Sequence, residues 1–126
     1  MSTTQVPVER RQQPRFNAVE GVFAALVNHH SKLGQIKDIS KTGLAFHYID
    51  HGNAPGEDCE LKIIIGKAGL YLDKLPFKKV ADFQIKSEHS FSSIKMRQIG
   101  LQFGELTCRQ HSRIEHFIQK HTIGEV

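Results

Sequence analysis

Residues 33–49 of the chain read LGQIKDISKTGLAFHYI. Residues 33–40 are a candidate strand, and residues 44–49 are a second one, in which large apolar residues alternate with residues of the other face. Between them, residues 41–43 (KTG) suit a tight turn, and Gly43 is expected to supply a backbone with positive φ. We therefore expect an antiparallel hairpin at the centre of the fold.

Further candidate strands lie on both sides of this hairpin, where residues are apolar and β-branched or alternate with a period of two. They are residues 19–27, 59–65, 70–72, 80–86 and 99–103. Turn formers are dense in residues 50–56 (DHGNAPG), which are expected to form a loop. The pattern leaves the strand boundaries between residues 66 and 93 open.

The last element has a different period. Thr107 and Gln110 fit a capping box, in which each side chain accepts a hydrogen bond from the other residue's backbone amide. Ile114 and Phe117 follow at helical spacing, so a helix of roughly four turns should pack one apolar stripe on the sheet. These elements together predict an all-β fold, a small antiparallel β-barrel with a C-terminal helix.

Composition limits the classes of protein to consider. The chain has 126 residues, 39% hydrophobic and 24% charged, which is typical of one globular domain. No apolar run approaches the roughly 20 residues of a membrane span. Residues 1–9 lack the apolar core of a signal peptide, so a cytoplasmic location is expected. The net charge of +4 and the pI of 9.2 favour anionic partners without choosing among them.

Two polar segments suggest a ligand site. Arg10, Arg11 and Arg15 are crowded around a proline, which disfavours a helix, so this segment is expected to form an extended arm. Asp38 and Ser40 stand in the hairpin. Arginine forks match guanine O6 and N7 and also pair with phosphates, while a carboxylate accepts from guanine N–H groups. We therefore expect a phosphate-bearing ligand with guanine-like edges.

The same residues resemble the paired signature of the PilZ domain family, RxxxR followed by [D/N]xSxxG. Arg11 and Arg15 match the first motif, and Asp38, Ser40 and Gly43 match the second. The strand over residues 99–103 (IGLQF) and the helix after it are also similar to that family. The resemblance covers nearly the whole chain, with residues 1–8 as a flexible lead-in, 9–121 as the domain and 122–126 as a tail.

The resemblance implies a six-stranded PilZ β-barrel that binds the bacterial second messenger cyclic di-GMP. By position, Arg11 and Arg15 would bind guanine edges and phosphates, Asp38 and Ser40 would bind the other face of the ligand, and Gly43 would shape the turn. An arginine directly before RxxxR is associated in that family with two stacked ligand molecules, and Arg10 stands there. An unidentified effector protein would then receive the signal and act in motility, biofilm or exopolysaccharide control.

Two alternative functions are an adaptor that binds proteins and a β-barrel that binds nucleic acid. A PilZ-fold adaptor that binds proteins without a ligand would need none of these arginines. A small β-barrel that binds nucleic acid is disfavoured, because the aromatic residues do not form a stacking platform. No catalytic motif indicates an enzyme. No cofactor is expected, and no metal either, because the histidines at 111, 116 and 121 spiral around the helix instead of sharing a face.

Overall fold

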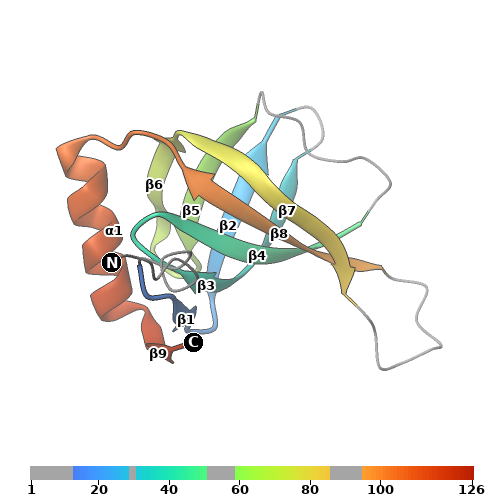
Figure 1. Ribbon diagram of the computed structural model, residues 1–126, viewed down its shortest axis with the longest axis horizontal. Coiled ribbons are helices and arrows are strands. Elements are labelled where there is room, and N and C mark those ends of the chain that lie inside the picture. The colour runs from blue at the N-terminus through green and yellow to red at the C-terminus, as the bar shows by residue number, and fades with distance from the viewer. Residues whose placement is uncertain (1–12, 29–30, 51–58, 86–94) are drawn as a thin grey trace, which may run out of the picture.

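The computed structural model describes residues 13–28, 31–50, 59–85 and 95–126. Within these ranges the chain forms nine strands and one helix. The elements are β1 (Phe16–Ala18), β2 (Val22–Val27), β3 (Lys32–Ile39), β4 (Gly43–Ile49), β5 (Glu60–Ile65), β6 (Gly69–Leu75), β7 (Phe77–Ile85), β8 (Met96–Phe103), α1 (Cys108–Lys120) and β9 (Thr122–Glu125). Figure 1 shows the strands wrapped into one curved sheet, with α1 at its side.

The strand pairs are all antiparallel. The order is β6-β5-β2-β3-β4-β8-β7, with β1 attached to β3 and β9 attached to β1. This confirms the prediction of an antiparallel β fold with a C-terminal helix. The expected six-stranded barrel is wrong, because the described sheet has nine strands and is not closed. Its end strands, β6 and β7, are joined through Pro76 instead of pairing with each other.

Two of the additional strands are short and lie at opposite ends of the sequence. β1 pairs with β9, placing Phe16 opposite Glu125 and Asn17 opposite Gly124. A backbone hydrogen bond from Val126 N to Arg15 O (2.8 Å) extends this ladder. Residues 122–126, expected as a tail, therefore contain a strand that holds the segment after the arginine arm. In Figure 1, β1 and β9 lie together beside α1.

β3 connects β2 and β1 within the sheet, because both strands pair with the same edge of β3. Its first half pairs with β2, and its second half pairs with β1. The side chain of Gln35 fills the gap between these ladders. Its Nε2 donates to Val19 O (2.9 Å), and its Oε1 accepts from Gly21 N (3.3 Å). Gly21 has a φ of +88°, so a residue without a Cβ suits this bend.

The core lies between the inner faces of the strands and the helix. Leu44, Phe46 and Tyr48 of β4 are buried, as the alternation predicted, and so are Ile114 and Phe117 of α1. The capping box is also confirmed: the Gln110 N–H donates to Thr107 Oγ1 (3.1 Å), and the Thr107 N–H donates to Gln110 Oε1 (2.9 Å). The helix therefore begins where the sequence predicts, with its apolar stripe facing the sheet.

Of the region that the pattern left open, residues 66–85 are described and form two long strands, and residues 86–93 lie outside the described ranges. β6 is longer than the expected residues 70–72, and its pairing with β5 shifts register between Leu61 and Ile63. Over this stretch β6 has one residue more than β5. Lys74 lies in this part of β6 and has a φ of +56°, which is typical of a β-bulge. β7 begins at Phe77, before the expected residue 80. The bulge and Pro76 together let the chain turn from one edge of the sheet to the other.

Candidate ligand-binding site

Ser40 holds the turn between β3 and β4 together. Its backbone N–H donates to Gly43 O (2.8 Å), and its Oγ accepts from the Thr42 N–H (3.1 Å). The Thr42 carbonyl in turn accepts from Phe103 N on β8 (2.8 Å). Ser40 is only 1% exposed. It therefore shapes the turn, in addition to the ligand contact that the family resemblance implies.

Gly43 has a different role from the one expected. Its φ is not positive, so the prediction that this residue supplies a left-handed backbone conformation is wrong. Instead, β4 and β8 approach so closely here that a Cβ on Gly43 would lie 2.2 Å from Leu101 O. Real Cβ atoms do not come that close to a backbone oxygen. Gly43 is therefore required by strand packing.

Arg15 and Asp38 form an ion pair beside this turn. Arg15 Nε donates to Asp38 Oδ1 at 2.9 Å, and a second nitrogen of the same guanidinium also donates to this oxygen. The Asp38 side chain is 6% exposed and the Arg15 side chain is 28% exposed. Arginine carries five donors, so the exposed part of the guanidinium can contact a ligand while the rest stays paired.

A β-bulge places Lys37 on the same face as Asp38. The pairing of β3 with β4 shifts register between Ile36 and Asp38, which inserts an extra residue into β3. Lys37 is exposed, and its Nζ lies 3.6 Å from Asp38 Oδ2. The two side chains therefore continue the polar surface that begins at Ser40 toward the middle of β3.

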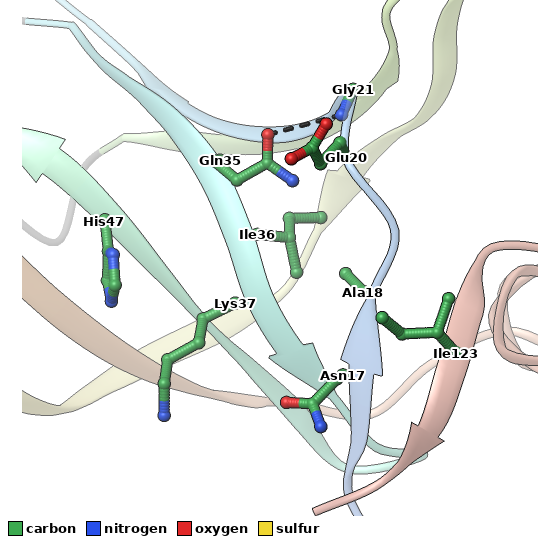
Figure 2. A pocket seen from close by; sticks show the side chains of 9 residues that line it. All are labelled: Asn17, Ala18, Glu20, Gly21, Gln35, Ile36, Lys37, His47 and Ile123. Carbon is green, nitrogen blue, oxygen red and sulfur yellow. Dashed lines mark hydrogen bonds between the residues drawn. The ribbon is translucent and has the colours of Figure 1, made fainter.

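This surface borders an open pocket with a volume of about 690 Å³. Its walls come from β1, the bend before β2, β3, β4 and β9 (Figure 2). The lining residues are Asn17, Ala18, Glu20, Gly21, Gln35, Ile36, Lys37, His47 and Ile123. Asn17 pairs with Asp38 across the β1–β3 ladder, so the pocket is continuous with the Arg15–Asp38 pair.

The structure thus brings together four of the six residues expected at the site, namely Arg15, Asp38, Ser40 and Gly43. Arg10 and Arg11 lie in residues 1–12, outside the described residues. The pocket residues belong to neither of the two sequence motifs. Lys37 is adjacent to Asp38 in sequence, but a lone lysine in a strand carries no signal of its own. His47 and the β9 residue Ile123 reach the pocket only through strand pairing.

A separate polar cluster lies between β4, β7 and β8. The Tyr48 hydroxyl donates to Asp82 Oδ2 at 3.0 Å, and Arg97 Nε donates to Asp82 Oδ1 at 2.7 Å. Burial, together with the neighbouring Asp82 carboxylate, raises the pKa of Tyr48 to about 12. The tyrosine is therefore neutral at physiological pH, and the cluster connects three strands at the core's edge.

Among the described residues, no group of three or more histidine, cysteine or acidic side chains is arranged to hold a metal ion. No helix in the described ranges is long and apolar enough to cross a membrane. The Arg15–Asp38 pair, the Ser40 turn and the adjoining pocket therefore remain the best candidate site, and they suit an anionic ligand that also carries N–H donors.

These features define a ligand-binding β-domain, and comparison with known proteins identifies its family. The PilZ domain matches residues 9–120, so the chain belongs to the PilZ domain family. No curated protein matches the chain.

Solved structures share the fold. The PilZ domain of YcgR from Escherichia coli, solved with c-di-GMP, superimposes with a TM-score of 0.69 at 13% identity, covering 90% of this chain and 92% of that one. The MrkH–c-di-GMP complex from K. pneumoniae gives a TM-score of 0.67 at 21% identity, covering 88% of this chain and 52% of that one. At these identities the comparison supports the fold.

Proposed function

We propose that this protein is a receptor for cyclic di-GMP that transmits the signal to a partner protein. One observation carries the proposal: Arg15 of the first motif and Asp38 of the second are hydrogen-bonded at 2.9 Å, next to the turn built by Ser40. Arg15 and Asp38, which belong to motifs distant in sequence, therefore lie on one surface. Two of the similar structures, the YcgR domain and MrkH, are complexes with c-di-GMP, which supports the same ligand.

The chemistry of this surface suits the two halves of a cyclic dinucleotide. The Arg15 guanidinium can pair with a phosphate or with guanine O6 and N7, each a planar match for its parallel donors. Asp38 can accept from guanine N1–H and N2–H groups through the oxygen that Arg15 does not hold. The pair also orients the arginine before binding, which lowers the entropy cost of ordering its long side chain.

Such a receptor acts through a partner protein. We propose a binding module instead of an enzyme, located in the cytoplasm. Residues 13–17 are connected through β1 to β9 and α1, so a ligand bound at Arg15 can change the surface that these elements present. We propose that this surface signals to an effector protein.

Isothermal titration calorimetry with cyclic di-GMP tests the proposal, with GTP and cyclic di-AMP as controls. We expect saturable binding that is selective for cyclic di-GMP. Arg15→Ala should weaken it by at least about tenfold, because one charge-assisted contact contributes about 1.5–3 kcal/mol. Arg109→Ala is the matched control, since this exposed helical arginine lies outside the site. An unchanged affinity in Arg15→Ala would contradict the assignment of the site.

Stoichiometry is the second readout of the same titration. We propose that Arg10 allows two stacked ligand molecules to bind, so the wild-type protein should take up about two per chain and Arg10→Ala fewer. The same stoichiometry in both proteins would refute this role of Arg10. Absence of any heat change with folded wild-type protein would contradict the receptor and favour the adaptor.

A further inference from the structure

The open pocket beside the Arg15–Asp38 pair is lined by no residue of the two sequence motifs. Its volume of about 690 Å³ is within the range of roughly 300–1,000 Å³ that is common for small-molecule sites. The pocket crosses four neighbouring strands, from His47 on β4 through Lys37 on β3 and Asn17 on β1 to Ile123 on β9. It therefore extends the motif surface sideways over the sheet.

The charges of the pocket are separated along its length. Lys37 lies at the end next to Asp38, with its Nζ 3.6 Å from that carboxylate. Glu20 lies at the other end, beside Gly21 and Gln35, as Figure 2 shows. Gln35 is engaged with the backbone on both sides of the bend, and Glu20 supplies a carboxylate at this end. A cation at one end and a carboxylate at the other match a guanosine phosphate, which has an anionic end and an N–H donor edge.

An apolar side chain completes this lining. Ile123 is 73% exposed, more than any other large apolar residue of the described chain. Ile123 lies between Gly124, which pairs with Asn17, and Thr122, which pairs with Ala18. The pairing of β1 with β9 shifts register at this point. Figure 2 shows Ile123 extending from β9 toward Ala18. This exposed surface contributes little to the core, but it offers an apolar wall of the kind on which a purine face can pack.

We propose that this pocket binds one guanosine phosphate half of the cyclic dinucleotide, with Lys37 on the phosphate, Glu20 on the guanine N–H edge and Ile123 against the base. This inference rests on the proposed function and deepens it. Binding draws Lys37 from Asp38 toward the phosphate, and Asp38 remains held by Arg15. Because Ile123 belongs to β9, the ligand also bridges the C-terminal strand to the motif surface.

Calorimetry with cyclic di-GMP on matched variants tests the pocket. Lys37→Met should weaken binding about tenfold by removing a charge-assisted contact, while Lys37→Arg should keep most of the affinity. Ile123→Ser should weaken binding about threefold by removing apolar contact area. Lys78→Met and Leu70→Ser make the same chemical changes at exposed strand positions away from the pocket, and they should leave the affinity within about twofold.

Selectivity gives an independent readout. Glu20→Gln should narrow the preference for cyclic di-GMP over cyclic di-AMP, because adenine lacks the N1–H and N2–H donors that a carboxylate binds. All of the altered side chains are exposed, so the thermal unfolding temperature should stay at the wild-type value, and a lowered one would assign them a structural role.

Two failures can be told apart. If the wild-type protein does not bind cyclic di-GMP, the proposed function is wrong, and the pocket assignment fails with it. In the other case the wild-type protein binds cyclic di-GMP and Arg15→Ala loses affinity, but the three pocket variants Lys37→Met, Ile123→Ser and Glu20→Gln all behave as wild type. This result would support the receptor and overturn the pocket assignment.

Discussion

Replacement of Gly43 by alanine should destabilise the protein strongly, although it adds a single methyl group. The new Cβ would lie 2.2 Å from Leu101 O, whereas ordinary contacts begin at 3.4 Å, so β4 and β8 must separate locally by roughly 1 Å. A separation of this size breaks the ladder bonds nearest to Gly43. It also disturbs the bonds from Ser40 N to Gly43 O and from Phe103 N to Thr42 O, both 2.8 Å long.

The cost follows from these contacts. Loss of two backbone hydrogen bonds costs about 2 kcal/mol, and the remaining steric strain adds about 1 kcal/mol or more. We therefore expect Gly43→Ala to lower the free energy of unfolding by about 3 kcal/mol, which corresponds to a fall in Tm of about 10 °C for a domain of this size. Urea unfolding and differential scanning calorimetry measure both quantities.

Gly100→Ala is the matched control, because it makes the same substitution on β8, in the same sheet. Its Cβ would meet the Ala81 side chain at 3.5 Å, an ordinary contact, so its stability should stay within about 1 kcal/mol of wild type. Gly43→Asn distinguishes two reasons for a glycine at this position, a positive φ and the lack of space for a Cβ. Asparagine tolerates a positive φ but still carries a Cβ, so it should be as destabilising as alanine. A Gly43→Ala protein with wild-type Tm would refute the argument.

Two further predictions concern stability. Tyr48→Phe removes the donor to the largely buried Asp82 and should cost about 1–2 kcal/mol at pH 7. Because the folded-state pKa of Tyr48 is raised from 10.0 to about 12, the stability that this hydroxyl contributes is fully present below pH 10 and is lost as pH rises from 10 to 12. Unfolding curves across this window should therefore decline less in Tyr48→Phe, and an equal decline would contradict the raised pKa. Thr107→Ala removes the capping box of α1 and should lower the free energy of unfolding by about 1 kcal/mol, as measured by urea unfolding. The cyclic di-GMP affinity, measured by calorimetry, should not change. A change in affinity would place the start of the helix in the ligand site.

Local patterns predicted much of this fold because local physics decides those elements. The alternation of Leu44, Phe46 and Tyr48 identified a strand and its buried face, since side chains in a strand point to opposite sides with a period of two. The capping box at Thr107 located the start of α1 for a similar reason, because the hydrogen bonds it needs are only three residues apart.

Longer-range features were not accessible in this way. β1 and β9 have three and four residues, too few to show a period. They are strands because they pair with segments distant in sequence, β1 with both β3 and β9, and β9 with β1. The expected six strands and closed barrel were wrong for this reason, and because β6 and β7, on either side of the corner at Pro76, do not pair with each other. The bulge that places Lys37 beside Asp38 also depends on the pairing of β3 with β4.

The sequence by itself determined the family, the class of fold and the residues of the two motifs, because these depend on residue types at short, fixed spacings. Only the tertiary structure decided that Arg15 holds Asp38, that Gly43 serves the contact between β4 and β8, and that Ile123 of β9 lines a pocket with Lys37 of β3. These contacts are set by strand register and by the distance between backbones. Both result from how all of the strands pack around one core, so no local segment of the sequence encodes them.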